Sequence, residues 1–348
     1  NISMLNLSSR QKLILKAVTE TYNETGVPVS SEEICKLPYL NFSSATIRFD
    51  MADLENMGLL EKPHTSGGRI PTNLGYEYYL DNLITKDIDM KRFYPIIDKI
   101  ILENKHRKEH AIKTVIAWLS NLTNTAILNT APSSALIISK IDLIHLSENT
   151  ALLVIVTENS QVQSETVNMP ALMAYYDIDK VVKKLNDLLV GKTIETAIQL
   201  FKSEEVVKKL NILINYQDMI MNLFLDAFQK FINETNYLEG IPNLLANKTF
   251  DKVELIRTFT EKIKNEEFLK LITSDQGLAV RIDDSIDFLP KGNCSVISIP
   301  YQINDQDNGA LAIIGPKRMD YKRIIPLIQY IAAQLSELFI KNDKEDNS

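Results

Sequence analysis

Residues 43–75, SSATIRFDMADLENMGLLEKPHTSGGRIPTNLG, contain the signals for a helix followed directly by a small β-hairpin. Ser43 can cap the helix, and Gly58 is a typical residue at which a helix ends. Residues 59–64 and 69–71 predict two short strands, because the small, glycine-rich TSGG between them is typical of a hairpin tip. The stripe of the helix that faces the core consists of Ile47, Met51 and Leu54.

The residues on either side of this stretch extend it into a compact unit. A serine pair at 8–9 can cap a helix that ends at Gly26, and a second pair at 30–31 can cap the short segment SEEICKL before Pro38. After the hairpin, Thr72 can cap a helix through GYEYYLDNL. Three helices with a tight turn between the second and third, followed by a hairpin, are the plan of a winged helix-turn-helix. A small helical domain used for protein contacts is the alternative.

The middle of the chain changes from helical to strand periodicity. Residues 85–92 are polar and predict a linker, and residues 93–123 have helical spacing. Three β-rich runs, ALIISKIDLIHL, TALLVIVTE and QVQSETVNM, then predict an antiparallel meander. The amphipathic segment DIDKVVKKLNDLLVG predicts a helix that ends on Gly191, with more helix up to about residue 234. The apolar stripe expected within residues 93–123 consists of Val115, Trp118, Leu119 and Leu122.

The last third mixes both kinds of element. A helix is predicted near residues 251–265, strands at LAVRI, CSVISIP and GALAIIG, and a terminal helix at YKRIIPLIQYIAAQLSELFI. Together with the first two thirds, this predicts an α+β fold class.

Composition limits the classes of function. The 348 residues include 38 Lys and Arg against 45 Asp and Glu, a net charge of −7, which argues against a protein that coats nucleic acid non-specifically. Cys35 and Cys294 lie far apart in sequence and outside any CxxC motif, which favours a reducing cytosol. Membrane-spanning runs and a signal peptide are not expected.

The sequence contains no motif of a known catalytic site. The GxSxG, P-loop, GxGxxG and HExxH patterns do not occur. His106 and His110 are four apart on a predicted helix, but the cationic residues around them disfavour a metal ion, so a solvated helix face is the preferred interpretation. We therefore expect a protein that is not an enzyme and has neither a metal site nor a cofactor.

The helix at 43–57 carries the candidate DNA-contact residues. Small residues on its outward face, Ala45 and Ala52, keep it slim enough for a major groove. Hydroxyls and free N–H groups at its start suit phosphates, and a guanidinium can reach a guanine edge or a phosphate. An aromatic ring in the centre of this face either touches thymine methyl groups or packs on a neighbouring domain. The residues concerned are Ser43, Ser44, Thr46, Arg48 and Phe49.

The hairpin is a second candidate contact. Lys62, His64 and Arg69 flank its tip, which suits a wing laid along the DNA backbone with Arg69 directed at a phosphate or the minor groove. The alternative is an ordinary exposed turn. Residues 1–75 carry seven basic and eight acidic residues, so we expect weak non-specific affinity and a symmetric dimer that places two units on one site.

Several segments of the chain, in order, resemble the bacterial family of the heat-inducible transcription repressor HrcA. They are LSSRQKLILKAVTETYNETGVPVSS, SSATIRFDMADLENMGLLEKPHTSGGRIPTNLGYEYYLDNL, LSNLTN, YLEGIPNLL and GPKRMDYKRIIPLI. The ATIR, DMADLE, GLLE and PHTS series and the GPKRMDY box are more specific than a generic winged helix. The resemblance implies a repressor of chaperone operons of the groE and dnaK type, which binds an inverted-repeat operator, CIRCE, and is relieved on heat stress.

The resemblance also implies a domain plan and partners. A winged-helix domain would span residues 1–85, a GAF-like domain residues 86–135 and 236–348, and an inserted α/β dimerisation domain residues 136–235. The chaperonin GroEL would promote the DNA-binding form, and unfolded protein would release the repressor by titrating GroEL. The family usually has Pro at the position of Ser44 and Asn at that of Phe49, so here an aromatic ring replaces an amide that could read a base.

We therefore expect a cytoplasmic homodimer that binds double-stranded DNA and does not contact a membrane. The alternative is a GAF-like ligand-sensing regulator whose winged helix mediates protein contacts. A co-purified small molecule would favour that alternative.

Overall fold

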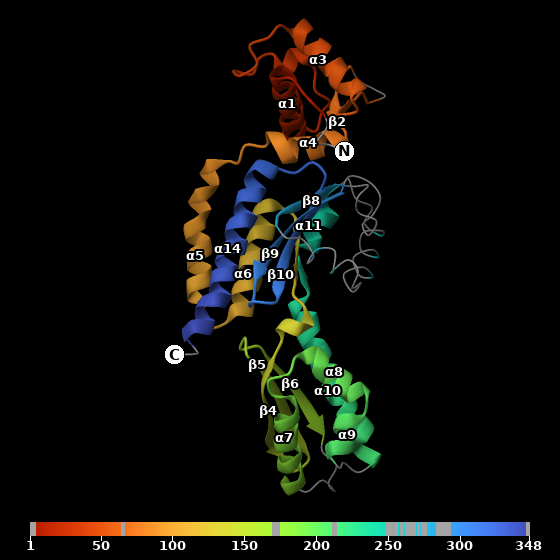
Figure 1. The fold of residues 1–348 in the computed structure, drawn as a ribbon, viewed down its shortest axis with the longest axis vertical. Coiled ribbons are helices and arrows are strands. Elements are labelled where there is room, and N and C mark those ends of the chain that lie inside the picture. The colour runs from red at the N-terminus through yellow and green to blue at the C-terminus, as the bar shows by residue number, and fades with distance from the viewer. Residues whose placement is uncertain are drawn as a thin grey trace.

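The molecule is elongated, with three regions arranged along its long axis (Figure 1). The N-terminal helices lie at one end, a sheet flanked by helices occupies the middle, and a unit built from the central part of the chain forms the other end. The computed structural model describes residues 5–63, 67–168, 175–210, 214–247, 277–282 and 294–345, with five isolated positions between 253 and 272.

The N-terminal unit has the predicted winged-helix plan. The Ser8 side chain forms a reciprocal capping box with Gln11 at the start of α1, and Gly26 ends that helix in a left-handed conformation, φ 68°. Ser30 caps the next helix, which is shorter than the SEEICKL segment suggested. The helices are α1 (Ser9–Thr25), α2 (Ser31–Ile34) and α3 (Ser44–Asn56).

A short hairpin and a further helix complete this unit. Strands β1 (Leu60–Glu61) and β2 (Ile70–Pro71) pair antiparallel, as predicted. Thr72 then caps α4 (Asn73–Tyr78), which continues as a π-helical turn over Tyr79–Leu83. Gly75 lies so close to the hairpin that a Cβ there would come within 2.0 Å of the backbone oxygen of Leu59, and this explains the glycine.

The middle region, here called the body, is built on a five-stranded antiparallel sheet with the order β7-β3-β10-β9-β8. The predicted strands LAVRI, CSVISIP and GALAIIG are confirmed as β8, β9 and β10. The sequence patterns missed β3 and β7, which are short and pair across large sequence separations. The strands are β3 (Ala126–Thr130), β7 (Tyr237–Glu239), β8 (Ala279–Ile282), β9 (Cys294–Gln302) and β10 (Asn308–Pro316).

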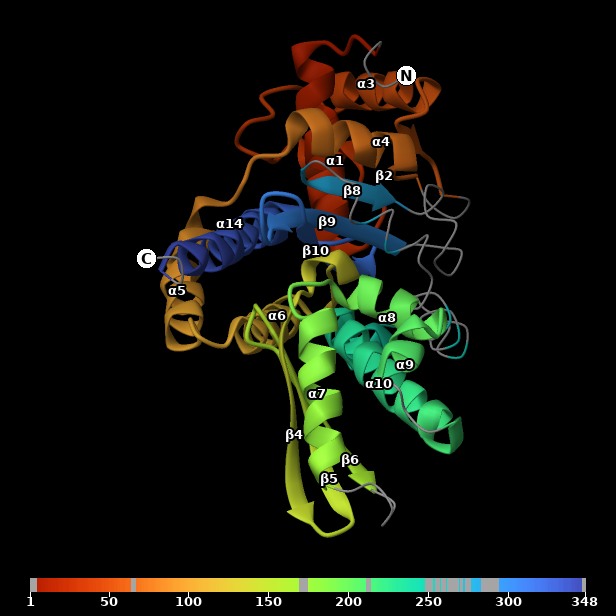
Figure 2. The ribbon, with the colours of Figure 1, turned by 60° about the horizontal axis from the view of Figure 1, so that its bottom comes forward.

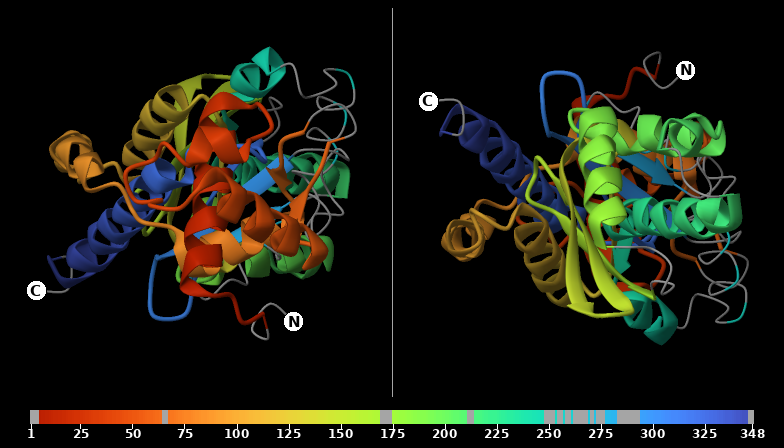
Figure 3. Two further views of the ribbon diagram at one scale, coloured as in Figure 1. Left: turned by 90° about the horizontal axis from the view of Figure 1, so that it is seen from above. Right: turned by 90° about the horizontal axis from the view of Figure 1, so that it is seen from below.

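Helices from both ends of the body sequence cover one face of this sheet and share one apolar core. The expected linker is partly structured, because Met90 lies in this core within the 3₁₀ helix η3 (Ile88–Phe93). In the views along the long axis, α5 and the end of α14 project to one side (Figure 3). On the other face α11 (Ile241–Ala246) packs. Helices α6 (Lys108–Thr123) and α14 (Tyr321–Glu345) lie on the sheet, and α5 (Tyr94–Glu103) packs against both of them.

Two expectations about residues 93–123 are wrong. Leu122 is 40% exposed and does not continue the buried stripe. His106 lies in a turn between α5 and α6, whereas His110 is in α6, so the two do not share a helix. Both histidines are exposed, and within the described ranges no cluster of three or more potential metal ligands occurs.

Among the described residues, one helix is long and apolar enough to cross a membrane by length and composition, residues 321–340 of α14. It packs against β9, α5 and α6, and Ile328, Ile331 and Leu335 are fully buried. This packing is that of a core helix.

The central unit, here called the insert, has its own core. The predicted meander is confirmed as an antiparallel sheet of β4 (Ile138–Ser147), β5 (Thr150–Thr157) and β6 (Val162–Asn168). Helices α7 and α10 lie on one face of it, and the strands extend away from the body (Figure 2). The helix predicted near residues 251–265 falls largely outside the described residues. The helices of the insert are α7 (Tyr175–Leu189), α8 (Ile194–Lys202), α9 (Glu205–Leu210) and α10 (Ile214–Thr235).

Candidate nucleic-acid interface

Helix α3 lies at the free end of the molecule, away from the body (Figure 1). Its predicted inward stripe is confirmed, because Ile47, Met51 and Leu54 are all buried in the winged-helix core. Ala45 and Asn56 are exposed on the other side. The slim face expected for a recognition helix is therefore open to a partner.

The hydroxyl groups at the start of α3 also hold its backbone in place. Ser43 Oγ accepts a hydrogen bond from the Thr46 backbone N–H at 3.2 Å and lies 2.8 Å from the Thr46 hydroxyl. Ser44 Oγ lies 3.0 Å from Ser31 Oγ, which joins α3 to α2. Ser44 stands at the first position of α3, where the family resemblance implies a proline. Its hydroxyl instead links α3 to α2.

Arg48 and Phe49 are the most prominent side chains of this face. Arg48 is exposed, and in the described part of the chain it has no ion-pair partner. The Phe49 side chain is 65% exposed, so it does not pack on a neighbouring domain of the same chain. An aromatic ring left this open in the monomer favours contact with another molecule.

The wing differs from the expectation at Arg69. Its Nε donates a 2.8 Å hydrogen bond to Glu55 Oε2 in α3, and Nη1 donates to the Gly67 carbonyl at 3.2 Å. The Arg69 side chain is only 16% exposed. It therefore joins the wing to α3 rather than extending from the hairpin, while Lys62 is exposed and His64 lies outside the described residues.

A buried carboxylate on the inner side of α3 was not predicted from the sequence. Asp50 is 2% exposed, and its carboxylate accepts hydrogen bonds from the guanidinium of Arg10 in α1, one of them 3.2 Å long. The hydrogen bond and the charge of Asp50 raise the pKa of Arg10. The only sequence signal was an acidic residue next to the apolar stripe, and nothing local linked it to a partner 40 residues away.

The GPKRMDY segment, residues 315–321, contacts the winged-helix unit from the body. The Tyr321 ring lies 6.3 Å from that of Tyr76, and Lys317 Nζ lies 5.6 Å from the centre of the same Tyr76 ring. The Arg318 guanidinium lies where a side chain at Gly26 would have to sit. This segment is therefore one of the contacts that hold the winged-helix unit, and with it α3, against the body.

Comparisons with known proteins agree over nearly the whole chain. The family model described as the winged helix-turn-helix transcription repressor HrcA, DNA-binding, matches residues 6–83. The model described as the HrcA protein C terminal domain matches residues 109–325.

Full-length relatives and a solved structure are also similar. The heat-inducible transcription repressor HrcA of Acholeplasma laidlawii is 39% identical over 340 residues, 97% of this chain and 99% of the relative. That of Phytoplasma australiense is 38% identical over 95% of this chain and 99% of the relative. A crystal structure described as that of a hypothetical protein aligns with a TM-score of 0.67 at 26% identity, covering 97% of this chain and 99% of that one.

Proposed function

The chain belongs to the HrcA family of heat-inducible transcription repressors, and from this premise we propose that it represses chaperone operons as a homodimer bound to an inverted-repeat CIRCE operator. The repressor function and the DNA-binding winged helix follow from the family. The operator, the operons and the dimer are the proposal.

The exposed face of α3 is the observation that carries the proposal. This face combines small residues with the guanidinium of Arg48, which has no ion-pair partner within the described residues. It lies at the tip of an elongated molecule, and a face of this shape can enter a major groove. We propose that Thr46, Arg48 and Phe49 reach the groove and that Lys62 contacts a phosphate. Three further positions complete the proposed surface: Ser43 and Ser44 at the start of the helix, and His64, which falls outside the described residues.

Arg69 has an indirect role in this proposal. Because its guanidinium is bound to Glu55, it fixes the angle between wing and helix instead of contacting DNA. A wing held in this way places Lys62 at a constant distance from α3. This positioning reduces the entropy lost when both elements contact the same duplex.

The proposed dimer is formed by the outer face of the insert sheet. Along β5, buried and half-exposed residues alternate, and the half-exposed set is Leu152, Val154 and Val156. Their neighbours Ile144 and Val162 are 48% and 54% exposed. This apolar stripe favours burial against a second copy.

The proposed domains follow the separate cores. The winged-helix core supports a domain over residues 1–85, the insert core a dimerisation domain over 136–235, and the sheet that joins β3 and β7 to β8–β10 supports a GAF-like domain over 86–135 and 236–348. A repressor of this kind works in the cytoplasm.

A footprint on chaperone promoters tests the function. Full-length protein should protect an inverted repeat, and added GroEL should lower the protein concentration needed for half protection. Protection of the repeat with no response to GroEL would remove only the chaperonin from the proposal. Absence of any footprint, with and without GroEL, would overturn the assignment of the operator.

A further inference from the structure

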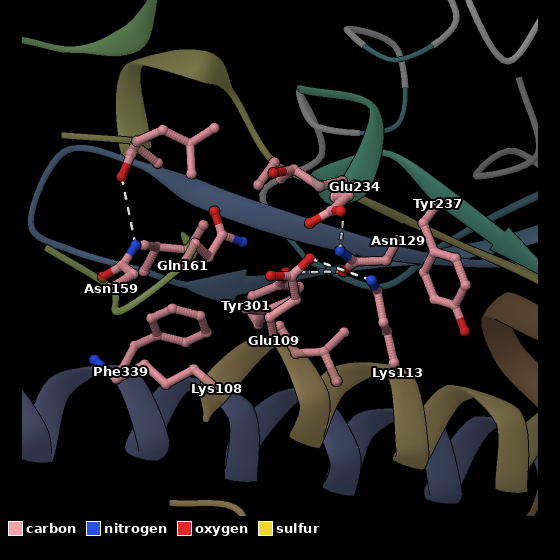
Figure 4. Close-up of a pocket in the computed structure, with 16 residues that line it drawn as sticks. Lys108, Glu109, Lys113, Asn129, Asn159, Gln161, Glu234, Tyr237, Tyr301 and Phe339 are labelled. Atoms are coloured by element: carbon pink, nitrogen blue, oxygen red, sulfur yellow. Dashed lines mark hydrogen bonds and ion pairs between the residues drawn. The ribbon is translucent and has the colours of Figure 1, made fainter. Parts of the chain in front are cut away.

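A cavity of about 250 Å³ lies where the insert meets the body. The β5–β6 turn at Asn159 and Gln161 forms one wall, and the first turns of α6 form the other. It continues inward into a recess of about 30 Å³ next to Asn129 and Tyr301 (Figure 4). The two spaces share the lining residues Lys108, Glu109, Lys113, Asn159 and Gln161.

The inner wall contains two buried oxygen atoms without a hydrogen bond. Within the described part of the chain, Gln161 Oε1 accepts no hydrogen bond, and Glu109 Oε1 accepts none beyond its ion pair with Lys113; both oxygens belong to side chains that line the cavity. Buried acceptors of this kind cost free energy unless something donates to them. The pair therefore favours a ligand group with several N–H donors.

The charge of Glu109 is only partly compensated. Lys113 Nζ lies 3.4 Å from Glu109 Oε1. Burial raises the pKa of the Glu109 carboxyl, although Lys113 and a hydrogen bond from Gln161 oppose the rise. A second cation bound beside Glu109 would stabilise its ionised form.

Basic side chains surround the same cavity. Arg107 and His110 are exposed and line the cavity, and Lys113 lines both the cavity and the recess. Lys108 is buried beneath, with its Nζ 5.1 Å from the centre of the Phe339 ring. A purely cationic ligand would be repelled by these groups, whereas a ligand that also carries an anionic end would be held by them.

We propose that this cavity binds a free α-amino acid, with its ammonium group between Glu109 and Gln161 and its carboxylate toward Lys113 and Arg107. The volume suits a small metabolite rather than a drug-sized ligand. This inference goes beyond DNA binding, because it gives the repressor an effector site. Since the walls come from the body and from the insert, the bound amino acid would connect the two.

Calorimetry on the full-length protein tests the site. Each proteinogenic amino acid is titrated singly, up to about 10 mM, a range that detects even weak binding. At least one should bind, and its N-acetyl and carboxamide derivatives should not, because each lacks one of the two charges. Binding by none of them, or equal binding by a derivative, overturns the proposal.

Variants assign the binding to these residues. Glu109→Gln keeps the shape of the side chain but removes its charge, and should weaken binding roughly tenfold. Gln161→Ala should weaken it as well and serves if the first variant does not fold. Glu103→Gln, on the exposed end of α5, is the matched control and should bind like the parent. Unchanged affinity in folded Glu109→Gln, or in folded Gln161→Ala, overturns the site.

Discussion

Glu20 in α1 and Lys322 in α14 form an ion pair, with Oε2 and Nζ 3.1 Å apart, across the junction of the winged-helix unit and the body. The other oxygen of Glu20 accepts a 3.1 Å hydrogen bond from the hydroxyl of Tyr79. Burial and the charge of Glu20 raise the pKa of Tyr79, so the phenol stays protonated and remains a donor. Glu20 thus connects both sides of the junction.

Lys322→Ala should loosen the winged-helix unit without unfolding it. The ion pair is partly exposed, so its loss should cost about 1 kcal/mol, while hydrogen exchange over residues 84–88 should become faster. Lys99→Ala, which removes the exposed pair with Glu103, should leave that exchange unchanged. Equal exchange in the parent and Lys322→Ala would show that other contacts fix the unit.

Arg48→Ala should weaken operator binding. A lost base contact costs about 1–3 kcal/mol, and a lost phosphate contact lowers the salt slope by about one. Titration of an inverted-repeat duplex at several salt concentrations distinguishes these outcomes. Lys99→Ala removes the same charge far from α3 and should bind like the parent. If Arg48→Ala also binds like the parent, α3 is not the contact surface.

Arg69 and Glu55 should behave as one unit in DNA binding. Arg69→Ala and Glu55→Ala each release the wing from α3, so each should reduce affinity, and the double variant should lose little more than either alone. If Arg69 instead contacts DNA, only Arg69→Ala will reduce affinity. A double-mutant cycle by fluorescence anisotropy measures the difference.

Phe49→Asn should alter which operator bases are preferred without affecting folding. Its ring is 65% exposed in the monomer, so the free energy of unfolding should change by less than about 0.5 kcal/mol. Selection of binding sites from a randomised duplex compares the parent with the variant. Identical preferences would mean that Phe49 does not touch the bases.

Val154→Asp should dissociate the dimer. The substitution places a charge in the centre of the apolar stripe on the insert sheet, where a second copy would bury it. Ile88→Asp changes an apolar residue that is 75% exposed and serves as the control. Sedimentation equilibrium should give a monomer for the first and a dimer for the second. A dimeric Val154→Asp would place the interface elsewhere.

Local signals in the sequence were sufficient for the winged-helix unit. The caps at Ser8, Ser43 and Thr72 depend on backbone groups three residues away, so a short window contains the information. The alternation along β5 is equally local. For this reason the order of the helices, the hairpin and the meander was predicted, although α2 and the hairpin strands are shorter than expected.

Contacts between distant residues were not predictable in the same way. β3 pairs with β10, and Ala126 lies opposite Ile314, so neither strand alone indicates its neighbour. The side chain of Arg69 shows the same limit, because its charge suggested an exposed contact and only the structure shows Glu55 beside it. The cavity at Glu109 combines segments whose individual patterns are those of ordinary surface elements.

Because the GPKRMDY segment lies near the end of the chain, the winged-helix unit can dock on it only late in translation. The winged-helix unit is complete by residue 83, and domains fold in order as they leave the ribosome. The segment that holds this unit, and β10 beside it, are translated more than 220 residues later. A nascent chain therefore carries a folded but undocked DNA-binding unit for most of its synthesis.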